Sequence, residues 1–107
     1  MQNSHFSQVC FIAQQAAEKA IRALAYHRDL EVKGHSITII ANKLKVNGEI
    51  ESAGRLLDQY YISARYPDSL PAGAPFQFIS HDQAQEALAK SWIVLEFVQK
   101  YLHNNLP

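Results

Sequence analysis

The chain has 107 residues, of which 48% are hydrophobic and 19% are charged, with 10 Lys and Arg balanced by 10 Asp and Glu. This length fits one domain, residues 1–107, whose single core needs neither a metal nor a disulfide. A net charge of zero argues against a protein that coats nucleic acid or anionic membranes non-specifically, because that mode of binding depends on an excess of basic residues.

The single cysteine, Cys10, excludes an intramolecular disulfide and indicates a reducing compartment. It lies in an apolar stretch, so we expect an inert core thiol. The apolar stretches are shorter than the roughly 20 residues of a membrane span, and the N-terminus lacks the order typical of a signal peptide. Isolated glycines and the lone cysteine provide neither a phosphate-binding loop nor a zinc site. We therefore expect a soluble, cytoplasmic protein without a cofactor or metal.

Helical periodicity dominates the first half of the chain. From residue 5 to about 27, apolar residues recur every three or four positions and predict a long amphipathic helix rich in alanine. After a polar connection, Ser36 is a plausible N-cap for a second helix, over residues 36–46. Residues 37–40 could instead form a short strand; we favour a helix because no second β-rich segment exists to pair with it.

In the second half, Asn47-Gly48 predicts a turn, and a third helix follows over residues 52–64. Three prolines then predict a loop over residues 65–79, which is long enough to be functional. Ser80 and Gln83 form a capping box in outline and open a last helix, over residues 81–103. Its apolar residues follow seven-residue spacing, which is typical of packing along a bundle or against a partner. Within this helix we expect Trp92 to pack.

Three blocks of the sequence together resemble the HEPN family ("higher eukaryotes and prokaryotes nucleotide-binding"). They are residues 11–24, which contain Gln-Gln-Ala-Ala-Glu-Lys, residues 34–36, and residues 57–68, which contain Arg-Tyr-Pro-Asp. The resemblance implies an all-α, up-and-down bundle that usually forms a homodimer. Members occur as stand-alone prokaryotic proteins, often beside a small nucleotidyltransferase, and as the C-terminal domain of sacsin.

Family members commonly carry another amphipathic helix ahead of the one with the Gln-Gln-Ala-Ala-Glu-Lys block, whereas this chain begins about ten residues before it. We therefore expect a bundle of about four helices that lacks the family's first helix and exposes an apolar groove. A fragment or a partner subunit that covers the groove would explain this arrangement.

Many HEPN proteins resemble metal-independent ribonucleases with Arg, four to six residues and then His in the C-terminal part of the bundle. Here Arg65 has no histidine before His81. The pairs Arg22/His27 and Arg28/His35 match the spacing only in the first half of the chain. We therefore expect no catalytic residues and a non-catalytic dimerisation module; a ribonuclease or toxin component and a purely structural dimerisation domain stay open as alternatives.

Six residues are candidates for a small polar cleft that binds a nucleotide or another polyanion. Lys19 and Arg22 are neighbours on one helical face, and with Glu18 they could equally form a solvated edge of intrahelical ion pairs. His35 precedes a helix N-terminus, where an anion can bind, although it could also only pack or cap. The others, at the end of the third helix, could contact a phosphate and a base or could be structural: Arg65, Tyr66 and Asp68.

Tyr60 and Tyr61 are expected in the core or an interface rather than at a ligand.

Overall fold

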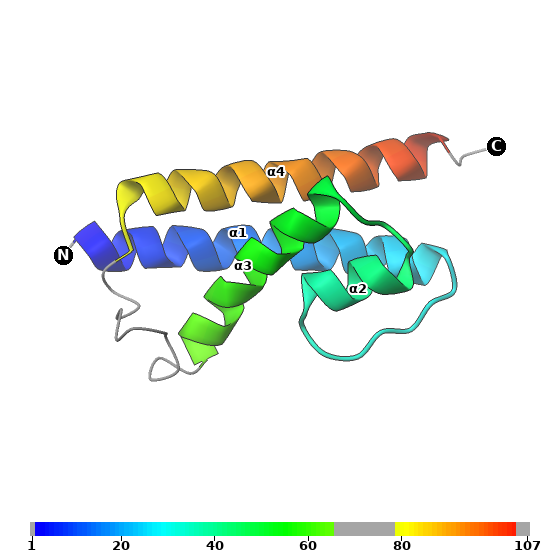
Figure 1. Ribbon diagram of the computed structural model, residues 1–107, viewed down its shortest axis with the longest axis horizontal. Coiled ribbons are helices and arrows are strands. Elements are labelled where there is room, and N and C mark those ends of the chain that lie inside the picture. Colours follow the sequence, from blue (N-terminus) through cyan, green and yellow to red (C-terminus); the bar gives the residue numbers. More distant parts are fainter. Residues whose placement is uncertain (1, 66–78, 105–107) are drawn as a thin grey trace.

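The computed structural model describes residues 2–65 and 79–104 of the chain (Figure 1). Four α-helices follow one another, and the described residues contain no strand. The helices are α1 (Gln2–His27), α2 (Ile37–Lys43), α3 (Glu49–Arg65) and α4 (His81–Asn104). None of these helices is long and apolar enough to span a membrane.

The two long helices, α1 and α4, lie side by side and run in the same direction (Figure 1). Near their N-termini the rings of Phe6 and His81 are 5.4 Å apart. In the middle, the Ser91 hydroxyl donates to the carbonyl oxygen of Ala13 at 2.8 Å. Buried alanines on both helices, including Ala17 and Ala87, leave room for this close approach.

Near the C-termini of these two helices, a polar contact ties them together. The guanidinium of Arg28 donates to the hydroxyl of Tyr101 and lies 5.5 Å from the centre of its ring. A cation over an aromatic face is electrostatically favourable. The pairing of α1 and α4 is therefore held at both ends and in the middle.

Helix α3 crosses this pair and runs in the opposite direction. Its first turn, with Ile50, lies beside Ile93 and Phe97 in the C-terminal half of α4, and Tyr60 in its last turns reaches Cys10 of α1. The short α2 packs against α3 and α1. Gly54 permits the close approach, because a Cβ there would lie only 3.0 Å from Ile37 Cγ2 and 3.1 Å from the backbone nitrogen of Thr38.

The predicted all-α fold is confirmed, with differences at helix ends. Ser36 is the N-cap of α2, and its side chain accepts from the amide of Ile39. The capping box of α4 also forms, through reciprocal bonds between Ser80 and Gln83 of 3.1 and 2.8 Å. Helix α3 starts three residues earlier than predicted, because Gly48 adopts φ 74° and its carbonyl accepts from the amide of Ser52.

Helix α2 is shorter than predicted. Leu44 is its C-cap, and Lys45 has φ 63°, so the helix cannot continue to residue 46. Most of the predicted proline loop lies outside the described residues, whereas Ile79 at its end is buried in the core.

Candidate functional site

A polar cluster at the centre of the molecule is built around Glu18 on α1. This side chain is only 6% exposed. Its Oε2 atom pairs with Arg22 Nη2 and His35 Nδ1, both at 3.0 Å. Its Oε1 atom accepts from Nε2 of the fully buried Gln14 at 3.1 Å. Burying a carboxylate is costly unless it is paired and hydrogen-bonded, and here both oxygens have partners.

The guanidinium of Arg22 also fixes the segment between α1 and α2. Besides its bond to Glu18, it donates to the backbone carbonyls of Val32 and Gly34. Gly34 has φ 90°, a left-handed conformation that suits glycine. Both terminal nitrogens of Arg22 therefore donate inside the protein, where they shape the backbone that carries His35.

His35 connects this segment to α3. Its ring stacks on the ring of Tyr61, with centroids 4.7 Å apart and planes 20° apart. The side chain of His35 is 53% exposed. Because Nδ1 faces Glu18, the opposite edge of the imidazole, with Nε2, is the one that an external group would meet.

The N-terminus of α2 is occupied by a carboxylate of the chain itself. Asp58 on α3 accepts from Ser36 Oγ at 2.7 Å, from the amide of Ile37 at 2.8 Å and from the amide of Thr38 at 3.2 Å. Orphan amides and the helix dipole attract negative charge at such an end. Asp58 thus occupies the position at the N-terminus of α2 that an external anion would otherwise take.

The structure brings together some of the predicted site residues. Arg22 and His35 meet at one oxygen of Glu18. Lys19 is exposed, and on α1 it is rotated by about 100° from Glu18. Arg65 is the last residue of α3, whereas Tyr66 and Asp68 lie outside the described residues.

The residues that organise the cluster were not among the predicted site residues. Glu18 was expected only at a polar edge, and its ion pair with Arg22 is indeed intrahelical, but the carboxylate is buried. Asp58 and Tyr61 contribute from α3 through contacts about 20 residues or more away in sequence. A Glu four residues before an Arg was the only local signal.

Cys10 and Tyr60 form a separate buried pair. Cys10 is fully buried, and this burial raises the pKa of its thiol to about 11. Burial, followed by the neighbouring Cys10, also raises the pKa of Tyr60 well above its usual value. A thiol that stays protonated is a poor nucleophile, so these data agree with the predicted inert core thiol and the predicted core position of Tyr60.

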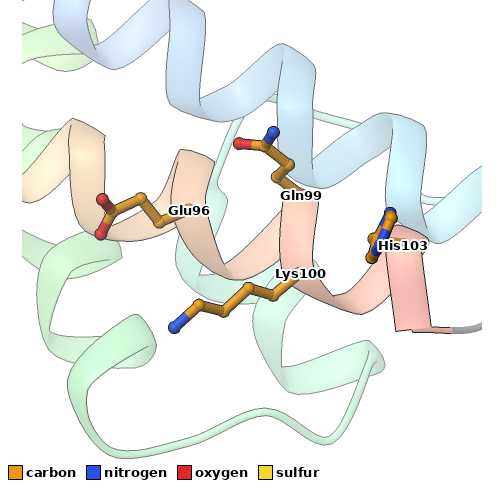
Figure 2. Close-up of a pocket in the computed structure, with 4 residues that line it drawn as sticks. All are labelled: Glu96, Gln99, Lys100 and His103. Atoms are coloured by element: carbon orange, nitrogen blue, oxygen red, sulfur yellow. The ribbon is translucent and has the colours of Figure 1, made fainter.

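Two adjoining hollows lie along the C-terminal half of α4. The larger, of about 430 Å³, is lined by Glu96, Gln99, Lys100 and His103 (Figure 2). All four side chains come from one helix, so they cannot enclose a ligand. The other hollow, of about 350 Å³, shares Glu96 and Lys100 and reaches Ile50 of α3. Neither hollow contains a predicted site residue, and no group of three potential metal ligands occurs among the described residues.

The expectation that Trp92 packs was wrong, because its side chain is 61% exposed. The positions of α4 that face the core include Ser91, Val94 and Val98, and the helical turn places Trp92 outside that stripe. Ile12 on α1 and Leu88 on α4 are also exposed, by 64% and 44%.

Comparisons with known proteins agree with this architecture. No curated protein matches the chain. The crystal structure of an archaeal HEPN homologue matches with a TM-score of 0.75 and 29% sequence identity, over 94% of this chain and 80% of that one. The family model of the HEPN domain matches residues 1–101. Because that match extends over nearly the whole sequence, the chain belongs to the HEPN domain family.

Proposed function

We propose that this chain is a non-catalytic HEPN module that associates with a second copy of itself and binds a nucleotide or another polyanion near His35. The observation that carries the self-association is the exposure of large apolar side chains, above all Ile12 and Trp92. Contiguous exposed apolar patches on soluble proteins are typical of interaction sites.

Sedimentation analysis tests the self-association. We expect a particle of about twice 12.1 kDa at tens of micromolar protein. A well-behaved monomer at that concentration would contradict this part of the proposal.

Three features support a binding site near His35. The imidazole is half exposed and stacked on Tyr61, and aromatic side chains can bind bases regardless of their identity. Arg65 follows Tyr61 by one helical turn and is continuous with Tyr66 and Asp68. In this proposal Arg22 acts by shaping the segment of His35 rather than by direct contact, because both of its terminal nitrogens already donate within the chain.

Isothermal titration with ATP and GTP at physiological salt tests this site. We expect micromolar binding that Arg65→Ala weakens about tenfold, since charge-assisted hydrogen bonds contribute roughly 1.5–3 kcal/mol each. Arg55→Ala is the matched control, because Arg55 lies on the same helix and pairs with Glu51 at the surface. Circular dichroism must show that both variants are folded. If the wild type does not bind either nucleotide, dimerisation is the only part of the proposed function that remains.

The ribonuclease alternative is tested with the same protein and single-stranded RNA in the absence of divalent metal. We expect no cleavage, because Arg22 and His35 are both held by Glu18. Cleavage that disappears in His35→Ala would overturn the non-catalytic assignment. Co-purification with a small nucleotidyltransferase tests the partner that the family resemblance implies.

A further inference from the structure

We infer that the second copy docks on the face of the α1/α4 pair that points away from α3, with α1 of each copy lying against α4 of the other. This inference rests on the self-association proposed above and specifies where and how it occurs. We call the surface the α1/α4 face and define it by its exposed large side chains: Ile12, Tyr26, Leu88 and Trp92.

On α4, these side chains lie on one flank of the helix. Leu88 and Trp92 are one turn apart, and the partly buried Leu95 follows at the next position of the same stripe. Phe97, which packs towards α3, is nine residues from Leu88 and therefore about half a turn away around the helix. The flank of Leu88 and Trp92 thus points away from α3.

On α1, the corresponding flank carries Ile12 and Tyr26. The buried Gln14, which faces the polar cluster, is rotated about 200° from Ile12. Since α3 packs on both α1 and α4, the flanks that avoid it lie on the same side of the two-helix layer.

The parallel arrangement places the two flanks in register. The ring contact of Phe6 with His81 and the hydrogen bond of Ser91 to Ala13 relate positions that are 75 to 78 residues apart. Ile12 therefore lies at the level of Leu88, about one turn before that of Trp92. These three large side chains occupy neighbouring levels of the two helices, and Tyr26 lies about 21 Å farther along α1.

Charge favours a second copy as the occupant of this face. Between the levels of Ile12 and Tyr26, the remaining positions of the α1 flank are Ala16, Lys19 and Ala23. On α4, the flank continues with Gln85, Leu95, Glu96 and Gln99. Lys19 and Glu96 carry opposite charges, so the face offers little to a highly charged partner, and two copies of it meet without a row of opposing like charges.

Size complementarity favours the pairing of α1 with α4. The α4 flank carries bulky side chains, whereas Ala16 and Ala23 on the α1 flank are exposed and have small side chains that leave space for them. A two-fold axis parallel to the helices and midway between them brings each α4 against the α1 of the other copy. Since Trp92 lies at about the level of Ala16, one turn after Ile12, this symmetry places Trp92 of one copy against Ala16 of the other, beside Ile12.

The natural tryptophan provides the first test, because Trp92 is the only tryptophan in the chain. Its fluorescence is recorded for the wild type over a dilution series, in parallel with sedimentation. We expect the emission maximum to move to shorter wavelength with the same midpoint as dimer formation. A dimer whose emission stays at the wavelength of the monomer would place the interface elsewhere and overturn this inference, while a monomer at all concentrations would overturn the proposed self-association as well.

A pair of variants gives the second test. Trp92→Glu introduces a charge into the α1/α4 face, and we expect it to raise the dimer dissociation constant at least tenfold. Ile39→Glu is the matched control, because Ile39 is 50% exposed on α2, away from this face; we expect less than a twofold change. Equal effects of the two substitutions would overturn the inference.

Disulfide trapping tests the symmetry without a disruptive charge. Ala16→Cys and Trp92→Cys chains with different tags are prepared separately, mixed and oxidised. We expect the mixed 16–92 cross-link to exceed both self-cross-links. Exclusive 16–16 and 92–92 products would instead show that like helices face each other and would overturn the α1-against-α4 arrangement.

Discussion

The two sides of α1 meet very different surroundings. Towards α2 and α3, its polar side chains are paired with partners in the same chain, as at Glu18 and Arg22. Towards the α1/α4 face, Ile12 has no such surroundings and is 64% exposed. The polar residues of the HEPN sequence blocks therefore hold the fold together, whereas the surface available to a partner is apolar.

Removing the carboxylate that caps α2 is the strongest test of whether the polar contacts hold the fold together. Asp58→Ala eliminates an acceptor of two amides and one hydroxyl, and α2 has only seven residues. We expect the free energy of unfolding to fall by about 3 kcal/mol, because hydrogen bonds to charged groups contribute roughly 1.5–3 kcal/mol. Urea denaturation measures the change.

Asp82→Ala is the control for Asp58→Ala. Asp82 is also in the first turn of a helix, but its side chain is 99% exposed. We expect a loss below about 1 kcal/mol, as for an exposed charge near a helix dipole. Equal losses in the two variants would show that the contacts of Asp58 do not hold α2 in place.

A second test enlarges the closest contact between α2 and α3. Gly54→Val places branched carbons where even a Cβ would lie 3.0 Å from Ile37 Cγ2. We expect a loss of about 2 kcal/mol in unfolding free energy, within the range for overpacking. Gly54→Ala should be closer to neutral, because about 1 kcal/mol of helix propensity offsets the contact.

The control for Gly54→Val is Ser52→Val, at an exposed position of the same helix. It introduces the same side chain without the contact to α2. If both valine variants unfold at the same urea concentration, the close approach of α2 and α3 does not limit the size of the side chain at position 54.

The buried pair between α1 and α3 predicts loss of stability in alkali. The pKa of Cys10 is about 11 in the folded protein, against 9.0 for an unperturbed thiol. Stability is therefore complete below pH 9 and falls as the pH rises towards 11, because the unfolded chain releases this proton first. By pH 10 the expected loss is about 1.4 kcal/mol, and the raised pKa of Tyr60 acts in the same direction.

Urea midpoints at pH 8 and pH 10 measure this effect. In Cys10→Ala the difference between the two pH values should shrink, whatever the baseline stability of that variant. An unchanged difference would show that other groups cause the alkaline loss.

The smallest expected effect concerns the α1/α4 pair. Ser91→Ala removes the hydroxyl that donates to the Ala13 carbonyl but leaves the apolar packing intact. We expect a loss of about 0.5–1 kcal/mol by urea denaturation, whereas Ser52→Ala at the surface should be silent. A loss as large as that of Asp58→Ala would show that a hydrogen bond between α1 and α4 contributes as much as the polar contacts of Asp58. That result would contradict the contrast between the two sides of α1.

The fold could be predicted from the sequence because its signals are local. Ser36, Ser80 and Gln83 act within three residues of their own positions, and apolar periodicity marks each long helix. The predicted end of α2 was too late. The left-handed conformation of Lys45, which ends the helix, carries no sequence signal comparable to that of a glycine.

The polar cluster was less predictable because its contacts join distant parts of the chain. His35 reaches Glu18 across 17 residues, and Asp58 reaches Ser36 across 22. Periodicity shows that a carboxylate lies at the edge of a helix, but not which partner it meets. For the same reason, the seven-residue pattern of α4 did not show that Trp92 would be exposed.

The parallel run of α1 and α4 also bears on how the chain folds. Two parallel helices cannot be joined by a tight turn, so the segment between them must cross back first; the Ser91–Ala13 bond accordingly spans 78 residues of a 107-residue chain. The cap on α2 closes a loop of only 22 residues. Distant contacts incur loop-closure entropy and slow folding. We therefore expect the α2–α3 junction to form early and the pairing of the two long helices to complete the folding reaction.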